Sequence, residues 1–163
     1  MRPLFSNNAV WAAYEAILIS WLGTPYRHMQ RCKGRGADCT LFFAACLEEA
    51  GILTRVDYGY YPRDWHIHTY EELVLTSIHA NMDRHTKPGL RLVEMGLNTP
   101  LMRGDIVCFK ISHTGVTNHA GVMLAPGEFI HAGNFCGVTR QFLDDRYQGR
   151  LSTFFRFYED EVE

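Results

Sequence analysis

The cysteine patterns of a disulfide framework and of a zinc knuckle are missing from this sequence. Its five cysteines, at positions 32, 39, 46, 108 and 136, are odd in number and form no C-x-x-C pair. Their spacing argues against both kinds of site. We therefore expect most of them to be free thiols made in a reducing compartment, and we expect no metal and no cofactor.

A basic stripe and a long apolar run are missing as well. The 16 lysines and arginines are scattered and face 18 aspartates and glutamates, so we expect no nucleic-acid partner. The apolar stretch 10–22 is too short to span a bilayer, so no membrane partner is expected. Since the start lacks the charged residues and cleavage site of a secretory signal, we expect synthesis in the cytoplasm without a signal peptide.

The residues that are present predict one domain of the α+β class. The chain has 163 residues, 47% of them hydrophobic, which is enough for one core. Apolar positions at helical spacing predict helices over 8–22 and 38–50, each followed by a glycine. We interpret 54–99 as an insertion with one helical piece, 69–80. The segments "RGDIVCFKI", "NHAGVMLAPGEFIHAG" and "LSTFFRFY" are typical of an antiparallel β-meander against which the helices would pack.

One cysteine lies where a helix is expected to begin. If Asp38 caps the second helix, Cys39 is its first residue, where the helix dipole favours a reactive thiolate. Gly34 and Gly36 would let a substrate backbone come close to the sulfur. The alternative is that Cys39 is a packed thiol, as we expect Cys46 to be seven residues later, because free cysteine is among the most buried residue types.

Two histidines in the predicted strands supply a candidate base. If the hairpin loop is the three residues 125–127, His131 faces Gly121, and His119 is its diagonal neighbour on the same face. A two-residue turn would put the histidines on opposite faces. With the first register the parts fit nucleophilic catalysis, in which Cys39 attacks, His119 transfers the proton and His131 orients His119.

These residues resemble the NlpC-type cell-wall cysteine peptidases, a family with a papain-like core. The resemblance rests on "LGTPYRH" (22–28), "GADCTLF" (36–42), "RGDIVCF" (103–109), "NHAGVML" and "FIHA". It implies a single catalytic domain, 1–163, in which Cys39, His119 and His131 form a triad and the Tyr26 hydroxyl lines the oxyanion site. It also implies a peptidoglycan stem peptide as substrate, cleaved between γ-D-glutamate and a diamino acid.

The segment 60–75, "YYPRDWHIHTYEELVL", resembles the insertion of the phage and prophage tail-associated branch of this family. This implies phage tail proteins as partners and action at the cell wall as part of a phage or phage-like particle. We expect Asp38, Trp65 and His66 to contact the substrate, and residues 58–80 to wall one side of its groove. Tyr60 and Tyr61 could clamp substrate or pack in the core. His66 and His68 form an H-x-H pair that could also bind a metal.

Other interpretations of the same residues stay open. Asp105 is expected to be a turn or strand-entry residue and not a catalytic acid. The same thiol chemistry would serve an acyltransferase or an amidase with another substrate. A non-enzymatic tail structural or assembly protein could also keep the papain-like shell.

Overall fold

The computed structural model describes residues 1–55, 57, 59–61 and 72–160. The N-terminal part contains two helices, α1 (Asn8–Ser20) and α2 (Cys39–Glu49), close to the predicted ranges. The Asn7 side chain caps α1, and the Asp38 side chain caps α2 by accepting from Leu41 N at 2.9 Å. Both caps satisfy amide groups that a helix start leaves without partners. Among the described residues, no helix has the length and apolar character needed to cross a membrane.

The described residues form a seven-stranded antiparallel sheet with the order β1-β9-β5-β6-β7-β8, and β4 also pairs with β9. Its longest strand is β9 (Leu151–Glu159), and the others are β1 (Arg2–Pro3), β4 (Leu90–Met95), β5 (Ile106–Phe109), β6 (His119–Ala125), β7 (Glu128–Gly133) and β8 (Gly137–Phe142). Strands β5, β6 and β7 follow one another as in the predicted meander, but β8, which was not predicted, comes next in the sheet, and the third predicted segment, β9, pairs with β5 instead. A separate short hairpin joins β2 (Arg31–Cys32) and β3 (Gly36–Ala37) inside the predicted loop.

The middle of the chain holds more regular structure than the sequence predicts. A continuous helical stretch consists of α4 (Leu73–Ser77), the π-helical segment η2 (Ile78–Met82) and α5 (Asp83–His85). It extends past the predicted end at residue 80, while residues 69–71 of the predicted helix lie outside the described ranges. Strand β4 follows and was not predicted. It joins the sheet by pairing with β9. None of its residues is fully buried, and its sequence shows no clear alternation of apolar and polar residues that would have predicted a strand.

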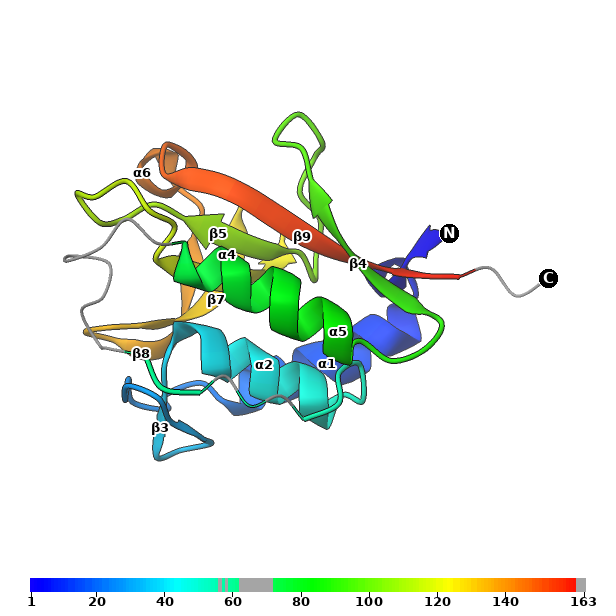
Figure 1. Cartoon of the computed structure of the whole chain (residues 1–163), viewed down its shortest axis with the longest axis horizontal. Helices are drawn as coiled ribbons and strands as arrows, with labels where there is room; N and C mark the ends of the chain where they lie inside the picture. Colours follow the sequence, from blue (N-terminus) through cyan, green and yellow to red (C-terminus); the bar gives the residue numbers. More distant parts are fainter. Residues whose placement is uncertain (56, 58, 62–71, 161–163) are drawn as a thin grey trace.

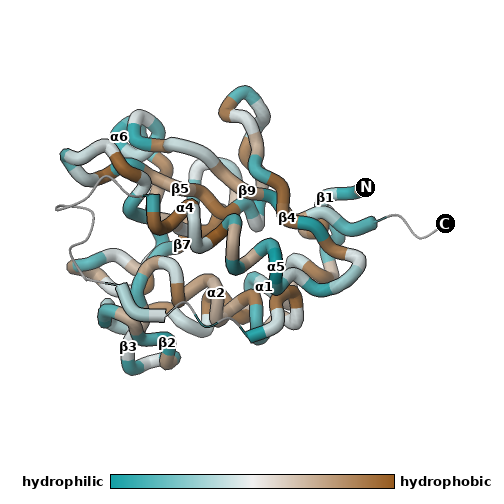
Figure 2. The backbone as a smooth tube through the Cα atoms, viewed as in Figure 1, coloured by the Kyte–Doolittle hydropathy of each residue, from teal (hydrophilic) through white to brown (hydrophobic). Residues whose placement is uncertain are grey.

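The sheet has a different hydrophobic core on each face, and Figure 1 shows α1, α2 and α4 packed together beside it. The helices cover one face, where Phe42 and Phe43 of α2 pack with Ile130 and Ala120 of the strands. Figure 2 shows the hydrophobic residues concentrated along α2 and the strands, and hydrophilic ones in the β2–β3 hairpin. The alternate residues of the same strands point to the other face, where they form a second hydrophobic cluster with the short helix α6 (Asp145–Gln148). This cluster comprises Val107, Phe109, Met123, Phe129, Leu143, Tyr147 and Phe154.

The turn between β6 and β7 differs from the prediction. Ala125 pairs with Glu128, so the turn has the two residues Pro126 and Gly127, not three. The register shifts between Met123 and Ala125, which leaves Leu124 as an extra, bulged residue.

The bulge restores the register that the three-residue loop would have given. Val122 pairs with Ile130, so the preceding residue, Gly121, is opposite His131. The two histidines therefore face the same side of the sheet. The prediction that a two-residue turn must separate them was wrong, because it did not include a compensating bulge.

Asp105 enters β5 as the sequence predicts, and it forms a buried ion pair. Its carboxylate accepts from Met102 N and binds Arg156 of β9 through two hydrogen bonds of 2.8 Å each. The Arg156 guanidinium also donates to the Pro100 carbonyl at 2.8 Å. Every oxygen of the Asp105 carboxylate thus has a partner, which ties β5, β9 and the preceding loop together.

Candidate active site

The two histidines are joined directly. His119 Nε2 lies 2.7 Å from His131 Nδ1, and the rings are nearly perpendicular, with centroids 4.9 Å apart. Glycine at position 121 is needed for this arrangement, because a Cβ there would lie 2.8 Å from the Ile130 carbonyl and 3.1 Å from His131 Cβ. The strand register therefore presents the pair at the start of β6.

Aromatic rings surround the pair on the second face of the sheet. The His131 centroid lies 4.9 Å from that of Phe129 and 6.1 Å from that of Tyr147, and Phe109 lies 6.2 Å from His119. Burial in this cluster lowers the pKa of His119 to about 3, with repulsion from His131 as a second cause. Burial also lowers the pKa of His131 to about 4. Both imidazoles are therefore neutral near pH 7.

Cys39 lies at the start of α2, against the head of β6. The backbone N–H of Ala120, the residue after His119, is close enough to lower the pKa of the Cys39 thiol, and the Thr40 hydroxyl lies 3.8 Å from the Cys39 sulfur. In the part of the chain that the structure describes, no hydrogen bond joins the Cys39 sulfur to the His119 ring. Cys39 therefore lies against Ala120, and the histidine pair is held by the preceding residue of the same strand, His119.

The protonation state of Cys39 differs from the prediction. The helix-dipole argument predicts a lowered thiol pKa, but burial, together with the neighbouring Asp38 carboxylate, raises the pKa of Cys39 to about 12. Hydrogen bonds from Thr40 and Ala120 lower it by less than burial raises it. Desolvation disfavours the thiolate more than the dipole and these donors favour it. The resting site therefore holds a neutral thiol beside two neutral imidazoles.

Asp38 is buried, with 2% of its surface exposed, and both of its carboxylate oxygens are engaged. Oδ1 accepts from Leu41 N at 2.9 Å, and Oδ2 accepts from Met29 N at 3.0 Å and from the Tyr61 hydroxyl. These contacts argue against the predicted direct contact between Asp38 and substrate. They make it the cap of the nucleophile helix and the attachment point of two loops.

Tyr26 is half-buried beside the strand that leads into α2, because its backbone forms an isolated parallel bridge with Ala37. Trp65 and His66 lie outside the described residues. The prediction that Gly36 lets a substrate backbone come close to the sulfur is wrong. A Cβ on Gly36 would overlap the Arg27 side chain, so the space there is filled by the protein itself and is not left for a substrate.

Two contacts of the site were missed by sequence reasoning. One is the Ala120 N–H, because a backbone donor has no side-chain signal in the sequence. The other is the Tyr61 hydroxyl on Asp38, 23 residues away along the chain. The aromatic density around Tyr61 was noted, but a residue pattern does not indicate which aromatic ring turns back toward the helix cap.

Comparison with known proteins supports the predicted resemblance to the NlpC/P60 family. No family model matches the chain. It is 27% identical over 142 residues to "Probable endopeptidase NlpC homolog" of Haemophilus influenzae, covering 86% of this chain but only 59% of that relative. It is also 27% identical over 144 residues to "Probable endopeptidase NlpC" of Escherichia coli, covering 88% of this chain and 75% of that relative.

Solved structures give the same result for the fold. An NLP/P60-family protein from Staphylococcus aureus superposes with a TM-score of 0.56 and 16% identity, over 91% of this chain and 41% of that one. The NlpC/p60 domain of the peptidoglycan hydrolase SagA gives 0.54 and 18% identity, over 88% and 96%. The chain therefore has the papain-like α+β fold of NlpC/P60 domains, as the sequence predicts.

Proposed function

We propose that this chain, which has the NlpC/P60 fold, is a cysteine endopeptidase that hydrolyses peptidoglycan stem peptides. The observation that supports this most is the juxtaposition of a thiol at the start of α2 with the head of β6, where His119 is hydrogen-bonded to His131. Relatives named as probable endopeptidases and a structural neighbour named as a peptidoglycan hydrolase support the same substrate class.

The proton arrangement of the histidines follows from their contact. The nitrogen of His119 that contacts His131 is Nε2, which leaves Nδ1 to act on the thiol. To accept a proton at Nδ1, neutral His119 must carry its own proton on Nε2 and donate it to His131 Nδ1. His131 then holds its proton on Nε2, which is buried and has no hydrogen-bond partner among the described residues.

In the proposed reaction, the Cys39 sulfur bonds to the scissile carbonyl carbon while its proton passes to His119 Nδ1. The carbonyl oxygen becomes an oxyanion, which the Cys39 backbone N–H and the Tyr26 hydroxyl stabilise. Breaking the C–N bond releases the amine, which takes the proton from His119. Water, deprotonated by His119, then hydrolyses the thioester and restores the thiol. Proton transfer accompanies attack, because the resting pair is neutral.

The bond that we propose is the one between the γ-carboxyl of D-glutamate and a diamino acid. We also propose that the enzyme reaches the wall with a phage or phage-like particle, an assignment supported by the resemblance of residues 60–75 to tail-associated members. Mass spectrometry of purified particles from a producing strain should find the chain, and its absence from them would remove this part of the proposal.

Hydrolysis of purified muropeptides tests the activity. The wild-type protein should release a fragment with a new amino group on the diamino acid, and Cys39→Ala should lower the rate by at least about a thousandfold, since the nucleophile is lost. Cys32→Ala is the matched control, because Cys32 is an exposed thiol on the β2–β3 hairpin. Cleavage of a different amide would indicate an amidase with another substrate. Equal rates for wild type and Cys39→Ala would refute thiol catalysis.

The second candidate function is a non-enzymatic tail structural or assembly protein. The raised pKa of Cys39, to about 12, favours it, because an ordinary packed thiol has this property too. Absence of cleavage of every muropeptide, in a wild-type protein that is folded, would decide for this candidate.

A further inference from the structure

We propose that Tyr61 is a positioning residue for the nucleophile, whose hydroxyl binds the Asp38 carboxylate and lessens its repulsion of negative charge on the Cys39 sulfur. The role rests on the proposed function only in treating Cys39 as the nucleophile. Its test measures the thiol directly and not peptide cleavage.

Asp38 has two tasks that conflict. As the cap of α2 it must be ionised to accept from Leu41 N most strongly, since a charged acceptor forms the stronger hydrogen bond. As the residue before Cys39, its negative charge raises the pKa of the thiol. A helix that begins with Asp-Cys therefore gains a cap and at the same time disfavours its own thiolate.

Additional donors to Asp38 resolve this conflict. Met29 N and the Tyr61 hydroxyl both donate to Oδ2, the oxygen that does not cap the helix. Met29 has a φ of 58°, in the left-handed region that non-glycine residues seldom adopt. The loop around residue 29 thus keeps a strained conformation at the point where it brings an N–H to this carboxylate. Hydrogen bonds spread the carboxylate charge and weaken its field at the sulfur.

Tyr61 is held in place by more than its hydroxyl. Its backbone carbonyl lies 2.7 Å from His28 Nε2, and the His28 ring packs edge-on against the Tyr61 ring with centroids 5.0 Å apart. His28 and Met29 are neighbours, so one loop fixes both the tyrosine and the carboxylate that it binds. The contact joins the segment after α2 to the start of the same helix.

The hydroxyl of Tyr61 is suited to be a permanent donor. Burial first, and then the negative charge of Asp38, raise the pKa of Tyr61 above its ordinary value, so the phenol stays protonated. The phenol also interacts electrostatically with Cys39 and with Tyr26. Tyr61 therefore lies among the groups that take part in the proposed reaction, although it transfers no proton in it.

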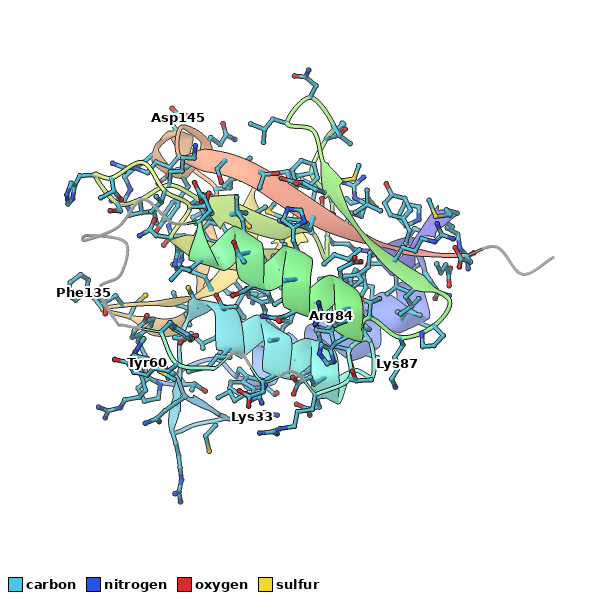
Figure 3. The ribbon with its side chains drawn as sticks, viewed as in Figure 1. Lys33, Tyr60, Arg84, Lys87, Phe135 and Asp145 are labelled. Carbon is cyan, nitrogen blue, oxygen red and sulfur yellow. The ribbon has the colours of Figure 1, made fainter. Side chains whose placement is uncertain are left out.

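The test is the alkylation rate of Cys39 by iodoacetamide, measured per peptide by mass spectrometry at several pH values. Cys32 and Cys136 are exposed and are replaced by serine beforehand, whereas Cys46 and Cys108 are buried. Tyr61→Phe should slow Cys39 alkylation about tenfold at each pH, corresponding to a rise of about one unit in the thiol pKa. The control, Tyr60→Phe, removes the hydroxyl of a neighbour that is 81% exposed and should change nothing (Figure 3).

A double-mutant cycle separates this role from simple loss of packing. Asp38→Asn keeps a good helix cap without the charge, so it should speed alkylation. In that background, Tyr61→Phe should have less than about a twofold effect, because no carboxylate remains to be stabilised. Equal slowing in both backgrounds would overturn the proposal, as would a Tyr61→Phe rate equal to wild type.

The two proposals fail separately. A protein that shows the tyrosine effect on alkylation but cleaves no muropeptide would refute the proposed hydrolase and leave the role of Tyr61 intact. A protein that cleaves muropeptides normally, with no tyrosine effect, would refute only the role of Tyr61.

Discussion

Asp105 with Arg156 is a buried polar pair and His119 with His131 a partly buried one, both attached to one sheet, but only the first pair carries opposite charges. The ion pair has two hydrogen bonds of 2.8 Å between its members and a further one to the Pro100 carbonyl. The histidine pair has one hydrogen bond, aromatic rings around it, and a His131 Nε2 that finds no partner in the described part of the chain. The first pair is saturated with partners, and the second is not.

The difference teaches what burial does to each pair. Around Asp105, burial raises the pKa of the carboxyl, and the hydrogen bonds and charge of Arg156 oppose that rise while tying the strands together. Around His119, no counter-charge among the described residues opposes burial, so both imidazoles stay neutral, each with one N–H. The buried Nε2 of His131, which has no partner among the described residues, also lowers the free energy of unfolding by about 1–3 kcal/mol. The ion pair holds charge inside the fold, whereas the histidine pair holds two neutral rings.

Breaking the ion pair should have the largest effect. Asp105→Ala leaves the Arg156 guanidinium buried without its counter-charge, and we expect a loss of about 3–5 kcal/mol in the free energy of unfolding. Urea unfolding followed by circular dichroism measures it. The matched comparison is Asp160→Ala, at an exposed ion pair with Arg91, which should cost less than about 1 kcal/mol. Equal losses for the two variants would show that the buried pair has no special role.

Breaking the histidine pair should affect rate more than stability. We expect His131→Ala to lower kcat/KM for muropeptides about 100-fold, within the range for a positioned acid–base group. That factor corresponds to about 2.7 kcal/mol of transition-state stabilisation. His131→Asn keeps an oxygen that can accept from His119 Nε2–H and should recover part of the loss. A fall in activity that merely follows a fall in melting temperature would contradict this role.

The smallest expected effect is that of pH on turnover. With the pKa of His119 at about 3 and that of Cys39 at about 12, neither group titrates near neutrality, so kcat/KM should change less than about twofold between pH 5 and 8. Below about pH 4 the rate should fall as His131 and then His119 are protonated. Measuring initial rates in buffers of constant ionic strength checks this. An acid limb centred near pH 6.5 would show that the histidine is not desolvated as described.

The parts of the fold that depend on neighbouring residues could be predicted from the sequence. The start of α2 was predicted because its cap, Asp38, acts within one turn, and the start of α1 was predicted from the helical spacing of its apolar residues. The shared face of His119 and His131 follows from alternation along two consecutive strands. The loop length between those strands was wrong, because nothing in the local pattern marks Leu124 as a bulge.

The parts that depend on tertiary packing could not be predicted. The pKa of Cys39 was expected to be lowered by the helix dipole, which is local, but it is raised mainly by burial, which depends on what the rest of the chain places over the sulfur. Strand β4 is only partly buried and gives no clear pattern. The contact between Tyr61 and Asp38 joins two segments that nothing in their composition relates.

Strand β9 has a consequence for the order in which the site can form during synthesis. It is the strand to which β1, β4 and β5 all attach, and it comprises residues 151–159. Cys39 leaves the ribosome more than a hundred residues before this strand does. The sheet that carries the histidines cannot be completed until then, because β9 pairs with β1, β4 and β5, which come from distant parts of the chain. The nascent protein therefore presents Cys39 long before the surroundings of the histidine pair are complete, and those surroundings are finished only once this strand has docked.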